Sequence, residues 1–275
     1  MTEKRLQSLK EYQGEDQIIS APELSLALES KAGPVISVKS NMPTLDRYIE
    51  GFQGGEVYAV SGPTKMGKTL LCQSFTVEFI KQQIFPVWFS YEVPARQFLA
   101  QFGEVPFIYM PARLKAHDMS WLEDRIREGF AKYHSRVVFV DHLHYLFDIA
   151  RSRNPSLDIG GVIRRLKSLA VDHGFIIFLL CHTTKGKSEG NLSYESIRDS
   201  SFVSQESDCV FMIRRTPRDG ENRAQVRIEF HRRTGCLEKV IRLEKVARYL
   251  REVVDMPEDE SPCPPGEEKG RWWDS

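Results

Sequence analysis

The residues of this chain with the clearest chemical potential form an octapeptide between an apolar segment and a helical one. Residues 62–69 read Gly-Pro-Thr-Lys-Met-Gly-Lys-Thr and match the pattern G-x-x-x-x-G-K-[ST] at every fixed position. Gly62 and Gly67 let the backbone curl so that several N–H groups face phosphate oxygens. Lys68 and the N-terminus of the next helix add positive charge, and the Thr69 hydroxyl is placed to ligate Mg²⁺.

This octapeptide predicts a loop that binds ATP together with Mg²⁺. The alternative is a glycine-rich turn that only connects a strand to a helix, but the apolar strand before it and the helix after it favour the binding loop. The residues expected to contact the nucleotide are Gly62, Pro63, Thr64, Lys65, Met66, Gly67, Lys68, Thr69 and Leu70.

Two carboxylates at the ends of apolar runs are the next candidates for chemistry. Residues 136–141 end in Asp141, and residues 89–92 end in Glu92. In an open α/β sheet the carboxyl ends of the strands face the ligand crevice. There Asp141 would hold the metal with Thr69, and Glu92 would accept a proton from water attacking the γ-phosphate. The alternatives are a strand-end aspartate and an exposed loop glutamate without such roles.

The pattern along the chain predicts the elements that must position these side chains. Apolar runs alternate with helical patterns through the first two thirds of the chain. Ser120 and Glu123 have the spacing of a capping box at the start of one helix. The alternation predicts an α/β domain with a mostly parallel central sheet and helices on both faces. Strands are expected at 57–61, 86–91, 107–110, 136–141 and 175–181, and helices at 68–82, 94–102, 121–133 and 160–172.

After Asp208 the pattern changes to strands without helices. The turn signals Asp219-Gly220 and Thr234-Gly235 separate three apolar runs, which predict an antiparallel extension of the sheet. These runs cover residues 209–214, 225–231 and 239–243.

The composition predicts three parts of unequal order. Residues 1–35 are polar with one amphipathic stretch at 21–28, and we interpret them as an N-terminal arm or linker with a short helix. Residues 36–254 should form one compact domain. Residues 255–275 are acidic, contain prolines and lack periodicity, which predicts a disordered tail. Within that tail, residues 271–274 (Arg-Trp-Trp-Asp) are either a partner-binding tip or a terminus without a role.

Charge and hydropathy narrow the classes of protein. Lys and Arg number 38 and Asp and Glu also 38, so the chain has no general basic coat for nucleic acid, although a local basic channel is compatible with this balance. No apolar run approaches the roughly 20 residues needed to span a membrane, and the N-terminus has no signal-peptide core. We expect a cytoplasmic protein with no membrane partner. The five cysteines are scattered and are interpreted as buried thiols.

In their order, these elements resemble the RecA-like motor domain of DnaB-type replicative helicases over roughly residues 36–249. The resemblance implies a RecA-like P-loop NTPase fold, with the catalytic glutamate at Glu92 and the metal carboxylate at Asp141. It also implies a γ-phosphate and DNA sensor at His182, and an arginine finger for a neighbouring subunit at Arg233. The segments that carry it are FSYEVPARQ, VVFVDHLH, LLCHTTK, IRDSSFVSQESD and HRRTG.

The chain departs from the family pattern at several points. His182 stands where bacterial members have Gln, and His231 stands where they have the Lys beside the finger, so that one cationic contact becomes pH-dependent. We also expect the family's N-terminal primase-contacting domain to be absent, because about 35 residues precede the motor domain.

The resemblance further implies two loops that hold single-stranded DNA by its phosphates in the channel of a ring, which is a hexamer in that family's pattern. The corresponding residues are 147–160, with Arg151 and Arg153, and 183–194, with Lys185 and Lys187. The alternative is two solvated surface loops. The expected partners are single-stranded DNA and further copies of the chain, with a primase, a loader or a single-strand-binding protein as candidates.

The leading interpretation is an ATP-dependent, ring-forming helicase or translocase on single-stranded DNA that acts in DNA replication. One alternative is a RecA-, RadA- or KaiC-like ATPase in recombination or regulation, because residues 37–62 also resemble those proteins. A second alternative is a nucleotide-gated loader or adaptor with little turnover.

Overall fold

The computed structural model describes residues 2–14, 16–31, 35–146, 155–182, 200–216 and 220–253. Contacts between residues divide the chain into two compact units, residues 1–35 and 36–275. The smaller unit contains helices α1 (Glu3–Lys10) and α2 (Ala21–Lys31), the second of which begins where the sequence predicts a helix. The predicted tail at 255–275 lies outside the described residues.

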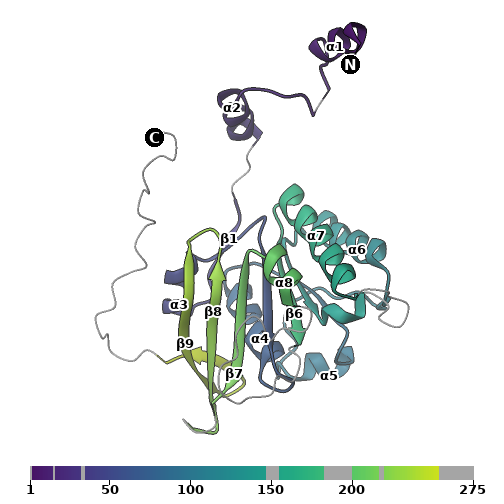
Figure 1. The fold of residues 1–275 in the computed structure, drawn as a ribbon. Helices are drawn as coiled ribbons and strands as arrows, with labels where there is room; N and C mark the ends of the chain where they lie inside the picture. The colour runs from purple at the N-terminus through teal and green to yellow at the C-terminus, as the bar shows by residue number, and fades with distance from the viewer. Residues whose placement is uncertain are drawn as a thin grey trace, which may run out of the picture. The chain divides into compact units, whose positions relative to one another are not determined.

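The larger unit is built on an eight-stranded sheet, which Figure 1 shows with its covering helices. The strand order is β10-β9-β8-β7-β3-β6-β5-β4. The five strands from β7 to β4 pair in parallel, and β8, β9 and β10 continue the sheet in antiparallel pairing. The strands are β3 (Val57–Gly62), β4 (Val87–Ser90), β5 (Val137–Asp141), β6 (Ile176–His182), β7 (Cys209–Arg215), β8 (Arg223–His231), β9 (Cys236–Val246) and β10 (Tyr249–Glu252).

The other elements of the described residues connect and cover this sheet. A small antiparallel pair, β1 and β2, flanks α3 ahead of the main sheet. The bounds are β1 (Ser37–Val38), α3 (Pro43–Ile49), β2 (Phe52–Gln53), α4 (Lys68–Lys81), α5 (Ala95–Ala100), α6 (Met119–Tyr133), the 3₁₀ helix η1 (Leu143–Leu146), α7 (Pro155–His173) and α8 (Ser200–Glu206).

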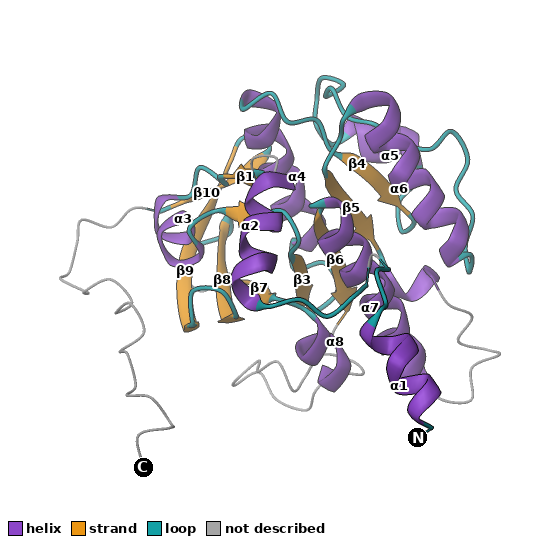
Figure 2. Ribbon diagram, turned by 90° about the horizontal axis from the view of Figure 1, so that it is seen from above, coloured by secondary structure: helices purple, strands orange, loops and turns teal. Residues whose placement is uncertain are grey.

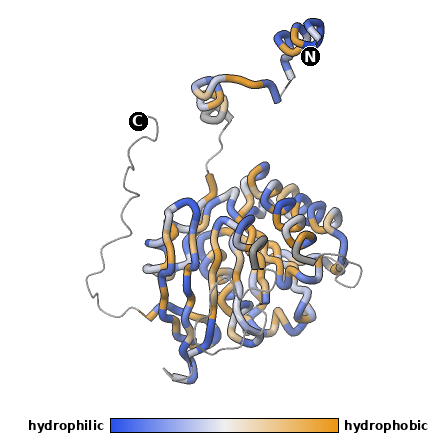
Figure 3. Tube along the Cα trace, in the orientation of Figure 1, coloured by the Kyte–Doolittle hydropathy of each residue, from blue (hydrophilic) through white to orange (hydrophobic). Residues whose placement is uncertain are grey.

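Alternate residues of each central strand enter two different apolar cores, because successive side chains of a strand point to opposite faces. Tyr58 and Val60 of β3 pack with the helices α3, α4 and α5, whereas Val57 and Ala59 pack with α6, α7 and α8. Figure 2 shows helices on both sides of the sheet, and Figure 3 shows apolar residues concentrated along the central strands. Both faces are therefore buried, which is why these strands read as continuous apolar runs.

The predicted fold class is confirmed: the sheet is mostly parallel, with helices on both faces and an antiparallel C-terminal extension. The predicted strand at 107–110 is wrong. Only Tyr109 forms an isolated bridge, with Val87, because Pro106 and Pro111 flank the segment and cannot donate to a ladder. The predicted loop at 147–160 is also too long, since α7 begins at Pro155.

No helix in the described ranges is both long and apolar enough to cross a membrane.

Candidate nucleotide-binding site

Strand register brings the predicted site residues to one edge of the sheet. Gly62 at the end of β3 pairs with His182 at the end of β6, and Asp141 at the end of β5 pairs with Ser90 at the end of β4. Glu92 follows β4 by two residues. Because neighbouring parallel strands end together, side chains far apart in sequence meet here.

The loop at 62–69 passes close to strand β7 before it enters α4. Gly62 has a φ of 150°, and a Cβ there would lie 2.3 Å from the carbonyl oxygen of Ile213. Only glycine fits this approach without displacing the neighbouring strand. Lys68 and Thr69 then form the first turn of α4, whose free N–H groups and dipole favour an anion in front of them.

The ammonium group of Lys68 is held between the loop and His182. Its Nζ donates to the carbonyl oxygens of Gly62 at 2.9 Å and Pro63 at 3.0 Å, and lies 3.0 Å from His182 Nδ1. Burial lowers the pKa of Lys68, while the negative charges of Glu92 and Asp141 act in the opposite direction.

His182 connects Lys68 to Glu92. A protonated Lys68 can only donate, so Nδ1 of His182 must accept and the ring proton resides on Nε2. That atom lies 3.7 Å from Glu92 Oε2. Burial and the charge of Lys68 lower the pKa of His182 below its ordinary value of 6.5, against the effect of Glu92. The imidazole is therefore neutral at pH 7 in this environment.

Thr69 and Asp141 form the pair expected to hold a metal. The Thr69 hydroxyl donates to Asp141 Oδ2 at 2.9 Å, and Asp141 is buried. Burial raises the pKa of Asp141 from 3.8 to about 6, although the hydrogen bond from Thr69 acts against this rise. Two hard oxygen ligands suit Mg²⁺, which takes its remaining ligands from water and substrate phosphates. Among the described residues there is no group of three or more His, Cys, Asp or Glu arranged to hold a metal.

A cavity of about 560 Å³ opens in front of the loop. Lys65, Gly67, Lys68, Thr69 and Leu70 line it on the loop side, and Glu92 and His182 face it from the neighbouring strands. Met66 lines a smaller adjoining cavity of about 140 Å³.

Five further residues of the large cavity were not expected from the sequence: Gln73, Val93, Gln101, Lys245 and Arg248. Lys245 and Arg248 belong to the C-terminal strands β9 and β10 and the turn between them, far beyond the loop in sequence. No local pattern marks them, because only the folding of the sheet extension brings them to the nucleotide-binding loop.

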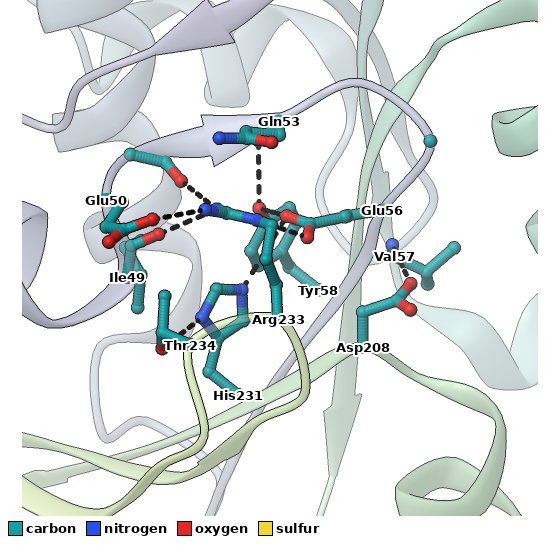
Figure 4. Close-up of polar contacts among 12 residues, drawn as sticks. Ile49, Glu50, Gln53, Glu56, Val57, Tyr58, Asp208, His231, Arg233 and Thr234 are labelled. Carbon is teal, nitrogen blue, oxygen red and sulfur yellow. Dashed lines mark hydrogen bonds and ion pairs between the residues drawn. The ribbon is translucent and has the colours of Figure 1, made fainter. Parts of the chain in front are cut away.

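Arg233 lies outside this cavity, in the turn between β8 and β9, where it contacts its own chain (Figure 4). Its guanidinium donates to Glu56 Oε1 at 2.8 Å, to Glu50 Oε2 at 3.1 Å, and to the carbonyl oxygens of Ile49 and Gly51 at 2.7 and 2.9 Å. These contacts tie the turn to α3 and to the start of β3.

Glu56 is the centre of the network in Figure 4. Tyr58 donates to it, and the buried His231 places Nε2 3.6 Å away. Burial acts to raise the pKa of Glu56, but His231, Arg233 and Tyr58 outweigh it and lower the pKa from 4.5 to about 2. His231 also contacts Thr234 Oγ1 through Nδ1 at 2.9 Å, so its side chain faces this network and not the solvent.

The predicted DNA-binding residues Arg151, Arg153, Lys185 and Lys187 lie outside the described residues.

The loop, the sheet order and the strand-end carboxylates together define a RecA-like P-loop domain. A family model described as an AAA domain matches residues 26–188, more than half of the chain. The chain belongs to this family.

Individual relatives agree with the predicted resemblance to DnaB-type motor domains. A "Probable replicative DNA helicase" of Trieres chinensis is 21% identical over 228 residues, which are 70% of this chain and 50% of the relative. The chain thus spans about half the length of this curated relative.

Solved structures share the fold at low sequence identity. One that is described as an ATPase domain has a TM-score of 0.70 at 15% identity, covering 85% of this chain and 97% of that one. A DnaB-like replicative helicase, described with its interactions with primase, has a TM-score of 0.68 at 15% identity over 90% and 70%. A KaiC-like protein from Pyrococcus horikoshii OT3 has a TM-score of 0.62 at 19% identity over 80% and 100%. The RecA-like fold of DnaB-like motor domains is confirmed.

Proposed function

We propose that this chain hydrolyses ATP with Mg²⁺ and uses the energy to move along single-stranded DNA as a helicase motor in DNA replication. The observation that carries the hydrolytic part is the meeting of Lys68, Thr69, Glu92 and His182 at one cavity, with Asp141 hydrogen-bonded to Thr69 behind it. Similarity to a probable replicative helicase supports the motor part.

Each side chain has a chemical role in this proposal. Lys68 binds the terminal phosphates, and Thr69 and Asp141 hold Mg²⁺, which neutralises charge on the phosphates when it is bound. Glu92 orients the attacking water and accepts its proton. His182 positions Lys68 and donates from Nε2 toward the γ-phosphate.

Catalysis in this proposal also needs Arg233 from an adjacent subunit, which implies a ring, a hexamer in the DnaB-type pattern. The position of Arg233 in a turn outside its own cavity supports action on a neighbour. Its contacts with Glu50 and Glu56 mean that it must exchange these partners for a phosphate.

DNA contacts are assigned to Arg151, Arg153, Lys185 and Lys187, which would bind phosphates without regard to sequence. A primase is a candidate partner because one structural relative is described with its interactions with primase. A loader and a single-strand-binding protein are candidates only through the resemblance to DnaB-type motors.

The first experiment measures ATP hydrolysis with and without single-stranded DNA, with Lys68→Ala as the control. Stimulation by DNA that the variant lacks supports a DNA motor, and unwinding of a forked duplex then supports a helicase. Slow turnover that DNA does not change would contradict the motor and favour a nucleotide-gated loader or adaptor.

A second candidate is a KaiC-like ATPase without unwinding activity. The structural similarity that covers the whole of the KaiC-like protein from Pyrococcus horikoshii OT3 favours it. Hydrolysis without displacement of a duplex strand would support this alternative.

A further inference from the structure

Two cations from the C-terminal hairpin face the cavity of the nucleotide-binding loop. Lys245 lies in β9, and Arg248 lies in the turn that leads to β10. Both line the cavity of about 560 Å³ with Lys68 and Glu92. They come from the same chain as the loop, unlike an arginine supplied by a neighbour.

The hairpin is fixed against α4, which follows the loop, and against the segment just beyond α5. The Tyr249 hydroxyl donates to the carbonyl oxygen of Phe102 at 2.9 Å, just beyond α5. The backbone N–H of Leu250 donates to Ser74 Oγ of α4 at 2.9 Å. Arg248 is thus attached to two walls of the cavity through its next two neighbours.

The backbone beyond α5 leaves space for the side chain of Arg248. Gly103 has a φ of +90°, and a Cβ there would lie 2.8 Å from Nε and 3.1 Å from Cδ of Arg248. The guanidinium stem therefore lies directly against Gly103. Any other residue at this position would take a strained backbone conformation and would push against Arg248.

The charge around Arg248 is suited to an anion. In the described part of the chain, neither Arg248 nor Lys245 has a carboxylate within ion-pair distance, whereas Arg227 and Arg233 do. Four cations line the cavity, Lys65, Lys68, Lys245 and Arg248, against the carboxylate of Glu92. The wall that holds Arg248 includes Gln101, whose Oε1 accepts from Gln73 at 2.7 Å. Gln101 directly follows α5, the helix that begins shortly after Glu92.

We propose that Arg248 binds the terminal phosphate of the nucleotide in its own subunit, and that Lys245 binds beside it. This inference rests on the proposed function, because it assumes that the cavity holds a nucleoside triphosphate with its γ-phosphate toward Glu92. A guanidinium makes charge-assisted hydrogen bonds to phosphate, frequently bidentate. Because a triphosphate carries more negative charge than a diphosphate, the added cation at this cavity predicts a contribution to the preference for triphosphate over diphosphate.

The test is the affinity of the full chain for a fluorescent, non-hydrolysable ATP analogue and for the matching ADP analogue, both with Mg²⁺. Arg248→Ala should weaken binding of the ATP analogue by about tenfold or more, in the range of a lost charge-assisted hydrogen bond. It should weaken binding of the ADP analogue much less. Arg248→Lys, which keeps the charge, should lie between the two.

The matched control is Arg251→Ala, because Arg251 is an exposed arginine of the adjoining strand β10 and does not line the cavity. It should bind both analogues as the parent chain does. Since Arg248 is exposed, its removal should leave the thermal unfolding temperature unchanged.

Two results would overturn the inference: unchanged binding of the ATP analogue by Arg248→Ala, or an equal loss for both analogues. Lys68→Ala separates this failure from failure of the proposed function. If Lys68→Ala loses nucleotide binding while Arg248→Ala keeps it, the ATP site stands and only the role of Arg248 is lost. If the parent chain binds neither analogue, the ATP site itself is contradicted.

Discussion

His182 lies between Lys68 and Glu92, for which we propose different chemical roles. On one side its Nδ1 lies 3.0 Å from the Lys68 ammonium, and on the other its Nε2 lies 3.7 Å from Glu92. Because one ring nitrogen must accept and the other carries the proton, the imidazole can accept from Lys68 and donate toward Glu92 at the same time. At the scale of single residues, substitutions of Glu92 and of His182 should therefore affect ATP hydrolysis differently.

Glu92→Gln should bind ATP and lose nearly all turnover, by about 10² to 10⁴, because the amide cannot accept the proton of the attacking water. Steady-state hydrolysis and fluorescent-nucleotide binding measure the two effects separately. Asp124→Asn, an exposed carboxylate on α6, is a suitable control. Retained turnover in Glu92→Gln would remove Glu92 from the catalytic role.

His182→Gln should retain most activity, because the amide oxygen can accept from Lys68 while the amide N–H₂ donates. His182→Ala should lose about tenfold or more, since it leaves the buried Lys68 ammonium with one partner fewer. Hydrolysis rates of the two variants measured side by side check this order. Equal loss in both would mean that the imidazole itself takes part in proton transfer.

At the scale of elements, the β8–β9 turn depends on one buried carboxylate. Glu56 binds Arg233 and accepts from Tyr58, and these contacts join the turn to α3 and β3 (Figure 4). The resemblance to DnaB-type motors implies a catalytic role for Arg233, but its geometry in the single chain is that of an ion pair. Substitutions here should change stability as well as hydrolysis.

The pH dependence of this network follows from the lowered pKa of Glu56, about 2 in the folded chain against 4.5 ordinarily. A carboxylate with a lowered folded-state pKa stabilises the fold above pH 4.5 and loses this contribution as the pH falls toward 2. Glu56→Gln should therefore be less stable than the parent chain at pH 7, and the difference should shrink at pH 3. Urea unfolding at both pH values measures it.

Glu50→Gln is the matched control for this experiment, because Glu50 also contacts Arg233 but is 69% exposed at its side chain. An exposed pair contributes about 0–1 kcal/mol. Glu50→Gln should thus change the free energy of unfolding little at either pH. A stability loss in Glu56→Gln that is the same at pH 7 and pH 3 would contradict the predicted titration.

The core beneath the site is predicted to be sensitive at Phe178 of β6. Its ring stacks on Phe139 at 4.5 Å and on Tyr58 at 5.2 Å between centroids, and it is fully buried. Phe178→Ala should lower the free energy of unfolding by about 3–5 kcal/mol through lost burial and a cavity. Phe107→Ala, at a side chain 60% exposed, should cost far less in the same denaturant titration.

The residues at which helices begin could be predicted only in part from the sequence. The predicted capping box of Ser120 and Glu123 is wrong, because α6 begins at Met119 and Asp118 accepts from the N–H of Trp121 at 2.9 Å. Ser120 and Glu123 instead accept from Arg165 of α7. Arg165, a residue of another helix, thus binds the two side chains that the local pattern assigned to capping.

At the scale of the whole molecule, we predict that the N-terminal arm contributes to oligomerisation. The compact unit of residues 1–35 carries α2, in which Leu24 and Leu26 are exposed. Deletion of residues 1–30 should weaken oligomerisation, because exposed apolar side chains are suited to packing on another copy. Light scattering at matched concentrations measures the mass, and an unchanged mass would contradict the prediction.

Local sequence patterns were enough to predict the glycine-rich loop at 62–69, the parallel core and the positions of Asp141 and Glu92 at strand ends. These depend on local rules: the spacing of Gly62, Gly67 and Lys68, and apolar runs for strands buried on both faces. The distant groups that contact these residues could not be predicted, because they come together only in the folded chain. The register of β3 and β6 sets His182 beside Lys68, and the sheet extension brings Arg248 to the same cavity. Such contacts depend on strand order and hairpin anchoring, which local patterns do not encode.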